Sequence, residues 1–347
     1  MSVQLDVRRF TCPLAEPLET ADGTIESRTG FLIRLSDGSN VGYGEATPLE
    51  GWTESIEDCE EALEAAVEAS EHGRSAMIDA TDHTTAARHG ISLALADLAS
   101  TIDAQPLYRD LGALTRVPRV PVNATVGDGD PDETAAAVAD ASARGFGCCK
   151  IKVGTRSVDE DVERIREVRE VVGDEVDIRV DANGAWTFDQ ASRAVKSFDT
   201  LDVSILEQPL PAGALSGLAE LRGNGVAIAI DEGVLEHGVD AILEAQAADV
   251  FVFKPMALGG VDVARQLAAW VAESNRRVIV TTTIDAVVAR TAAVHLAAAI
   301  PNVLPSGLAT ASLLERDLGP DPVFIDGGTA VIPQTKGLGV EGVWDGT

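Results

Sequence analysis

The chain has 347 residues, 45% of them hydrophobic, which is enough for one large α/β barrel and a smaller second domain. Its 56 acidic residues outnumber 27 basic ones, and the formal net charge of −29 excludes nucleic acid as a partner. No apolar run approaches the ~20 residues that cross a bilayer, and the first residues lack a signal peptide's apolar centre, so we expect a cytoplasmic protein without a membrane partner.

The charge balance is the most unusual feature of the composition. Only five of the 27 basic residues are lysines, so positive charge comes mostly from arginine. A large excess of negative charge repels itself in dilute buffer and is screened in concentrated salt. We therefore put forward a halophilic source as a hypothesis, which melting temperature against potassium chloride would test. The four cysteines show neither a disulfide pattern nor zinc-ligand spacing, and we expect reduced thiols.

The amino-terminal third mixes strand and helix patterns. Alternating apolar residues predict strands over 3–9, 30–35 and 41–44, and helical spacing predicts helices over 55–70 and 85–102. Together these elements predict an α+β domain over residues 1–115, completed by the Gly-rich tail from about 320 to 347.

Two loops of this domain, 18–29 and 47–54, would form a lid only if they lay beside a barrel mouth. Three of their residues are predicted as substrate neighbours, namely Thr20, Arg28 and Trp52.

From Val117 the pattern changes to strand followed by helix, and the alternation can be counted eight times. The first strand is predicted over 117–127, the seventh over 277–283 and the eighth near 302–304. Repeated right-handed crossovers close a barrel, whereas a doubly wound sheet usually has a Gly-rich phosphate loop after its first strand, and none is found. Residues 116–319 are therefore predicted to form a (β/α) barrel.

Five charged residues in apolar surroundings mark consecutive units of this pattern. They are separated by 23 to 29 residues, close to the ~30 residues of one strand and its helix. Each charge is predicted to end a buried strand, and in a parallel barrel these ends open onto one face. The five are Lys152, Asp181, Glu207, Asp231 and Lys254.

Three carboxylates that converge in one cavity repel each other unless a cation lies among them, and hard oxygen ligands favour Mg²⁺, with Mn²⁺ as a substitute. Asp181, Glu207 and Asp231 are the predicted ligands, although each alone could be a helix cap or an arginine partner. Lys152 and Lys254 would flank the ion, where a lysine can act as a base. This layout predicts removal of a proton α to the carboxylate of a small-molecule substrate.

Short motifs around these residues carry a family resemblance: Lys150-x-Lys152, DANGAW at 181–186, EQP at 207–209, DE at 231–232 and KP at 254–255. In their order and spacing, together with GYGEATPL at 42–49, the chain resembles the enolase superfamily, and within it the muconate-lactonizing subgroup.

The resemblance implies a modified TIM-type barrel with an α+β cap and an essential Mg²⁺ on the three acids. It also implies Lys152 as general acid/base and Lys254 opposite it. Lys150 would support Lys152 electrostatically, and Asn183 and Glu232 would lie just behind the ligands. Oligomerisation into a homo-oligomer is left open.

The subgroup contains several reactions that share the lysine pair. Dipeptide epimerases resemble one another in an Asp-x-Asp after the eighth strand, where this chain has LPSGLAT at 304–310. Residues 280–297 are similar to the corresponding segment of o-succinylbenzoate synthases. Candidate substrate contacts are Thr282 and Thr283 at the seventh strand, and Ser306 and Gly307, which could offer a hydroxyl and an N–H to a distal carboxylate or form a plain turn.

The expected activity is therefore a carbon–oxygen lyase, an o-succinylbenzoate synthase that dehydrates 2-succinyl-6-hydroxy-2,4-cyclohexadiene-1-carboxylate in menaquinone biosynthesis. N-succinylamino acid racemase, muconate cycloisomerase and dipeptide epimerase are the alternatives. Sugar-acid dehydratases of the superfamily resemble one another in a His-Asp pair that is missing here. A non-catalytic metal-binding barrel is disfavoured, because it would not need both lysines.

Overall fold

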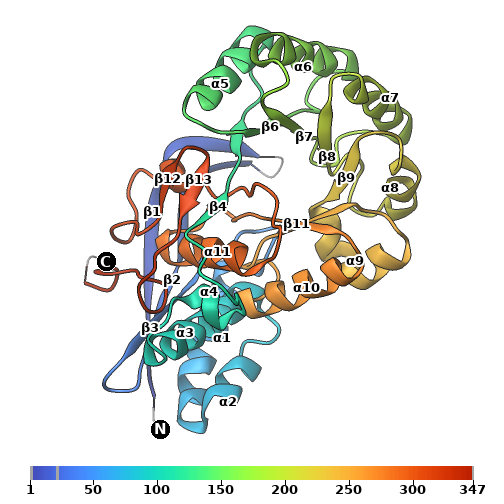
Figure 1. The fold of residues 1–347 in the computed structure, drawn as a ribbon. Helices are drawn as coiled ribbons and strands as arrows, with labels where there is room; N and C mark the ends of the chain where they lie inside the picture. Colours follow the sequence, from blue (N-terminus) through green and yellow to red (C-terminus); the bar gives the residue numbers. More distant parts are fainter. Residues whose placement is uncertain (1–2, 21–22, 346–347) are drawn as a thin grey trace.

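The computed structural model describes residues 3–20 and 23–345 (Figure 1). Its amino-terminal part is an antiparallel sheet in the order β1-β2-β3, followed by helices on one side of it. The elements are β1 (Gln4–Thr20), β2 (Gly23–Ser36), β3 (Val41–Ala46), α1 (Ile56–Ala69), α2 (Arg74–Asp79), α3 (Thr85–Ile102) and α4 (Leu107–Asp110).

The helices predicted over 55–70 and 85–102 agree with α1 and α3. The first two strands are much longer than predicted, and the expected loop over 18–29 belongs mostly to their hairpin. The prediction failed there because residues 23–27 are largely exposed, so no alternation of buried and exposed positions marks the strand. At β3, Gly44 lets α3 approach closely, since an added Cβ would lie 1.9 Å from the Gly90 carbonyl oxygen.

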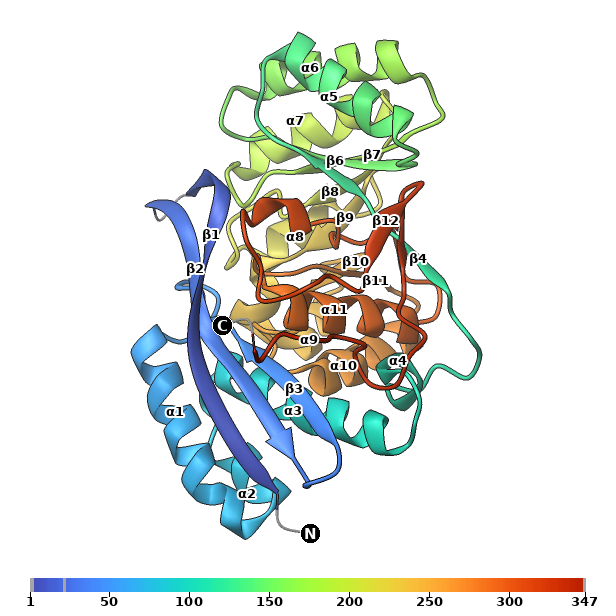
Figure 2. The same cartoon turned by 90° about the vertical axis from the view of Figure 1, so that its left-hand side faces the viewer.

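The second part is a curled sheet of seven parallel strands in the order β11-β10-β9-β8-β7-β6-β5, with helices outside it (Figure 2). The strands are β5 (Ala124–Val126), β6 (Cys148–Lys152), β7 (Asp177–Asp181), β8 (Val203–Glu207), β9 (Ala227–Ile230), β10 (Val250–Phe253) and β11 (Arg277–Val280). The helices are α5 (Pro131–Ala143), α6 (Val158–Val172), α7 (Phe188–Asp199), α8 (Leu215–Leu221), α9 (Glu232–Glu244), α10 (Val261–Glu273) and α11 (Val287–Ala299). Capping boxes begin α5, α6 and α7.

The eighth position of the barrel is filled without a regular strand. Leu304 and Gly307 donate N–H groups to Val278 and Val280 of β11, at 3.1 and 2.9 Å. On the other side the Ser306 N–H donates to the Pro121 carbonyl and the Ser306 carbonyl accepts the Asn123 N–H, both at 3.0 Å, so residues 304–307 connect β11 to the segment that leads into β5. The strand predicted over 302–304 is therefore wrong, because Pro305 removes a donor and only isolated bridges form.

The predicted first strand is split into two. β4 (Arg119–Pro121) pairs with β13 (Thr329–Val331), which pairs with β12 (Phe324–Asp326), while β5 alone joins the barrel. The tail was expected to return to the amino-terminal part, and its last section does so: the Leu338 N–H donates to Asp97 Oδ1, at 2.6 Å.

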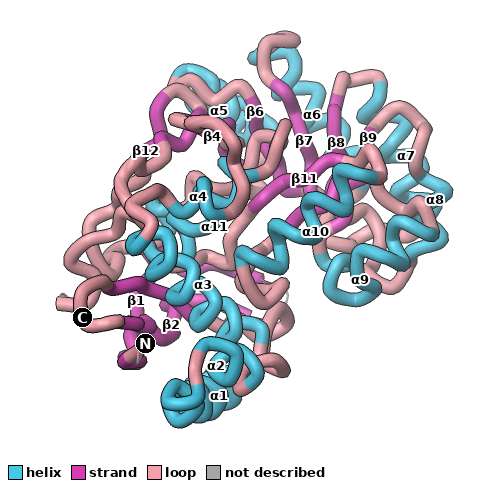
Figure 3. The backbone as a smooth tube through the Cα atoms, turned by 60° about the horizontal axis from the view of Figure 1, so that its bottom comes forward, coloured by secondary structure: helices cyan, strands magenta, loops and turns pink. Residues whose placement is uncertain are grey.

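Helix α11 lies between the amino-terminal sheet and β11 (Figure 3). All its residues are buried, most of them Ala and Val, and its one charged side chain, Arg290, donates to Asp317 and Asp321. Glu45 of β3 accepts N–H groups from Ala286 and Ala289, and Arg88 of α3 pairs with Asp262 of α10 at 3.1 Å. The domain bounds at 115 and 319 stay a prediction. Within the described ranges, no helix is long and apolar enough to cross a membrane.

Candidate active site

The five charged residues lie where the buried strands end. Lys152, Asp181 and Glu207 are the last residues of β6, β7 and β8, and Asp231 and Lys254 directly follow β9 and β10. Asp181 is in register with Lys152 on one side and with Glu207 on the other. Side chains in register on parallel strands point to the same face, so the regular spacing in the sequence becomes a continuous row of charges.

Ammonium groups contact the carboxylates at both ends of this row. Lys150 Nζ donates to Asp181 Oδ2 and Glu207 Oε1, both at 2.9 Å. Lys152 Nζ donates to Asp181 Oδ2 at 2.7 Å, and at the far end Lys254 Nζ contacts both carboxylate oxygens of Asp231. The structure therefore brings the three predicted ligands and both predicted catalytic lysines into one cluster.

The three carboxylates are almost completely buried, with exposed fractions of 1% for Asp181, 2% for Glu207 and 5% for Asp231. Burial raises the pKa of Glu207 to about 7, and the negative charge of Asp181 adds to the effect. Burial also acts on Asp181, but Lys150 and Lys152 outweigh it and hold the pKa of Asp181 well below its usual range. For Lys150, burial lowers the pKa, and the neighbouring carboxylates outweigh this and raise it.

The residues present fit the Mg²⁺ that the resemblance implies. Three buried carboxylates at adjacent strand ends form an all-oxygen donor set. Glu232 Oε2 is also buried without a hydrogen-bond partner in the described chain. Across residues 3–20 and 23–345, no three His, Cys, Asp or Glu side chains are gathered as a ready metal cluster. Lysine ammonium groups contact the carboxylates of Asp181 and Asp231.

Asn183 lies beside Lys152, and Glu232 contacts Asn183. Lys152 Nζ donates to Asn183 Oδ1 at 2.6 Å, and Asn183 Nδ2 donates to Glu232 Oε1 at 2.9 Å. Asn183 follows β7, and Glu232 is the first residue of α9. Two loops of the barrel rim thus meet at the amide of Asn183.

The loop over 47–54 reaches the charged row. Lys254 Nζ lies 3.4 Å from the centre of the Trp52 ring, a cation–π contact. Arg28 holds the loop to the barrel, since its guanidinium donates to the carbonyls of Thr47, at 2.8 Å, and Ile284, at 3.3 Å. These main-chain contacts give no support to Arg28 as a substrate neighbour, and the side chain of Thr20 lies outside the described residues.

The four predicted substrate contacts already have partners within the protein. Ser306 Oγ donates to the Leu304 carbonyl at 2.9 Å and accepts the Val280 N–H at 3.1 Å, inside the segment that closes the barrel. At Gly307 an added Cβ would lie 2.6 Å from Thr281 Oγ1. The remaining hydroxyls contact neighbours too, Thr282 with Thr310 and Thr283 with Asp285. Their role in substrate binding stays a prediction.

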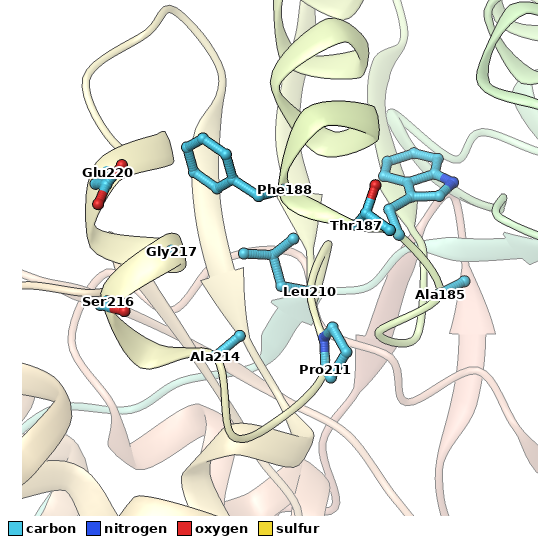
Figure 4. Close-up of a pocket in the computed structure, with 10 residues that line it drawn as sticks. Ala185, Thr187, Phe188, Leu210, Pro211, Ala214, Ser216, Gly217 and Glu220 are labelled. Atoms are coloured by element: carbon cyan, nitrogen blue, oxygen red, sulfur yellow. The ribbon is translucent and has the colours of Figure 1, made fainter.

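A separate pocket of about 540 Å³ lies between the loops that follow β7 and β8 (Figure 4). Phe188 and Leu210 lie near its centre, with Gly217 of α8 beside them. None of the predicted site residues lines this pocket. It is therefore distinct from the charged row.

Comparison with known protein families identifies both parts of the chain. Residues 133–345 match the family described as "Enolase C-terminal domain-like". The chain belongs to the enolase superfamily. Residues 3–98 match the family described as "MenC, N-terminal domain". The superfamily predicted from the short motifs is confirmed, and so is the enolase-like fold.

Individual relatives carry out different reactions. The L-Ala-D/L-Glu epimerase of Bacillus subtilis is 28% identical, over 98% of this chain and 96% of its own. Its substrate-liganded structure is similar with a TM-score of 0.89, at 27% identity over 99% of each chain. The o-succinylbenzoate synthase of Thermobifida fusca is 38% identical, over 59% of this chain and 64% of its own.

A third relative has been solved with ligands. The dipeptide epimerase of Enterococcus faecalis, complexed with Mg and the dipeptide L-Leu-L-Tyr, is similar with a TM-score of 0.87, at 27% identity over 98% of this chain and 99% of that one.

Proposed function

We propose that this superfamily enzyme uses Mg²⁺ to remove the proton α to the carboxylate of a small molecule. The observation that carries the proposal is the placement of two lysines at opposite ends of one row of buried carboxylates, Lys152 at Asp181 and Lys254 at Asp231. Asp181, Glu207 and Asp231 would hold the ion. Bound Mg²⁺ would supply positive charge that stabilises the negative charge developing on the substrate carboxylate.

Lys152 is the general base of this proposal. Its side chain is 37% exposed, against 17% for Lys150 and 11% for Lys254, so its Nζ is the one most open to a substrate. Lys150 Nζ already donates to Asp181 and Glu207, at 2.9 Å each, so it is directed at the carboxylates. As a neutral amine, Lys152 accepts the α-proton at Nζ and later returns a proton to the product or the leaving group.

Lys254 is the fixed cation of the proposal. Asp231 and the Trp52 ring both contact its ammonium group. We place it opposite Lys152, where its positive charge would stabilise negative charge on the substrate.

The relatives support two substrate classes. Epimerisation of a dipeptide, an isomerase activity, has the wider support, because the similarity to dipeptide epimerases extends over almost the whole chain. On this point the comparisons favour an alternative over the o-succinylbenzoate synthase expected from the sequence.

The synthase has local support of a different kind. The amino-terminal part matches the MenC family, and the identity over the shared region is higher, at 38%. Residues 304–310 also contain no acidic side chain that could bind the ammonium group of a dipeptide. N-succinylamino acid racemase and muconate cycloisomerase stay as further alternatives for the activity. A cytoplasmic location and a homo-oligomer also stay predictions.

A substrate panel tests both levels of the proposal. Purified protein with Mg²⁺ would be given the cyclohexadiene carboxylate, L-Ala-L-Glu, an N-succinylamino acid and muconate, and α-proton exchange in D₂O would be followed by NMR where the substrate has an α-proton. We expect turnover that a chelator removes and that Mg²⁺ or Mn²⁺ restores. Formation of o-succinylbenzoate would select the synthase and epimerised dipeptide the epimerase. The proposal would be refuted if no substrate of the panel gave either turnover or α-proton exchange.

A further inference from the structure

A chain of side-chain hydrogen bonds leads away from Lys152 toward the barrel rim. Lys152 Nζ donates to Asn183 Oδ1 at 2.6 Å, and Asn183 Nδ2 donates to Glu232 Oε1 at 2.9 Å. The chain runs from the end of β6, through the loop after β7, to the first residue of α9. It connects the exposed end of the charged row to a largely buried carboxylate that contacts neither substrate-facing lysine directly.

The donor and acceptor groups fix which end of the Asn183 amide faces each neighbour in this hydrogen-bond chain. A carboxylate only accepts hydrogen bonds, whereas an amide has one accepting and one donating end. Glu232 therefore fixes the Nδ2 end of Asn183 toward itself, and the Oδ1 end must face Lys152. If the amide were free to turn over, its NH₂ group would face an ammonium group that is itself a donor, and the contact would be lost.

The backbone also holds Asn183 in place. Asn183 has φ 43°, in the left-handed region that Asn tolerates better than most residues, and its N–H donates to Asp181 Oδ1 at 3.1 Å. With the backbone fixed, only the amide orientation remains to be set. Glu232 is the residue that sets it.

We propose that Glu232 is a positioning residue that directs Lys152 Nζ through the amide of Asn183. The inference rests on the proposed role of Lys152 as base. A general base must lie within hydrogen-bond reach of the proton it takes, so a lysine that loses its fixed direction keeps its substrate but reacts more slowly. Glu232 acts on catalysis while touching neither the substrate nor a reacting atom.

Two substitutions interrupt the hydrogen-bond chain at different residues. Glu232→Ala removes the acceptor, and Asn183→Gly removes the amide while tolerating the left-handed backbone. Each is expected to lower kcat about 10- to 100-fold, the usual cost of losing an orienting partner, with KM little changed. Glu232→Gln keeps an acceptor for Asn183 Nδ2 and should restore most of the rate. Glu236→Ala, an exposed position on the same helix, is the matched control.

Binding of Mg²⁺, measured by calorimetry, separates this role from an effect on the metal ligands. Glu232 neighbours Asp231 in sequence, so its loss could instead disturb the ion. The inference requires that Glu232→Ala bind Mg²⁺ as tightly as the natural chain. A fall in affinity that parallels the fall in kcat would overturn it.

The small number of lysines allows a readout that does not depend on activity. With lysine labelled by ¹³C at Cε, the chain gives signals from five residues, Lys150, Lys152, Lys196, Lys254 and Lys336. Lys152→Arg identifies the signal of Lys152. We expect this signal to shift in Glu232→Ala and Asn183→Gly, to recover in Glu232→Gln, and to be unchanged in Glu236→Ala.

The outcomes keep the two proposals apart. If the natural chain turns over no substrate of the panel, the proposed function fails, and the lysine signals still report whether Glu232 directs Lys152. If the natural chain is active while Glu232→Ala retains both its kcat and the natural Lys152 signal, the positioning role is refuted and the proposed function stands.

Discussion

Two regions of the barrel mouth differ in how their residues come together. In the strand ends of β6 to β10, each charge occupies the last position of a buried strand or the next one, and register alone aligns them. Around β11, residues 304–307 and the loop 47–54, alignment depends on contacts between distant parts of the chain, such as Glu45 with Ala286. In the first region every charge is placed by the same local feature, the end of a buried strand. In the second region no such local feature recurs.

We therefore expect the catalytic residues in the first region, and Lys152→Ala is the strongest test of this expectation. Loss of a general base typically costs about 10²- to 10⁴-fold in rate, and we expect kcat for α-proton exchange to fall in this range with folding intact. Exchange NMR and circular dichroism measure the two effects. Lys196→Ala, an exposed position on α7, is the control. A Lys152→Ala variant with the natural rate would remove this residue from the mechanism.

In the second region, Trp52→Ala tests whether the loop takes part in the chemistry. The contact with Lys254 is worth about 0.5 to 2 kcal/mol, so kcat/KM should fall by no more than about 30-fold, and Trp52→Phe should keep part of the contact. Trp270→Ala, at a partly exposed position of α10, controls for the loss of an indole. An effect as large as that of Lys152→Ala would show that the two regions are not separated as described.

What the sequence could predict follows the same division. The places of Asp181, Glu207 and Lys254 at strand ends were predictable, because burial gives each strand an apolar run and the charge ends it. The eighth position was not, since Ser306 joins the barrel through isolated bridges that leave no periodic pattern. The contact of Trp52 with Lys254 joins residues about 200 positions apart, and no local signal could indicate it.

Ser306→Ala decides whether the closing segment is structural or binds substrate. The hydroxyl accepts the buried Val280 N–H, and leaving such a donor unsatisfied costs about 1 to 3 kcal/mol. We expect thermal unfolding at a lower temperature, with KM unchanged. The exposed Ser312→Ala serves for comparison. A raised KM with natural stability would instead restore Ser306 as a substrate contact.

The smallest expected effect concerns Glu45, which links β3 to α11. Burial raises the pKa of Glu45 to about 7, and the charge of Asp285 adds to it, whereas an unfolded glutamate has a pKa of about 4.3. Between these values the folded chain binds more protons than the unfolded chain, so this group lowers the free energy of unfolding as pH rises from about 4 to 7, and no further above 7. Asp285 and Asp317 face Glu45 as acids and Arg28 is its nearby cation.

Glu45→Gln removes this titration. Denaturant unfolding measured from pH 4 to 8 should give a flatter stability curve than that of the natural chain, and some slope should remain because burial also raises the pKa of Asp97 to about 7. Glu61→Gln, at an exposed position of α1, should leave the curve unchanged. If Glu45→Gln kept the full slope, the carboxylate would be charged throughout this range. The contacts of Glu45 with Ala286 and Ala289 would then join two parts of the chain without any dependence on pH.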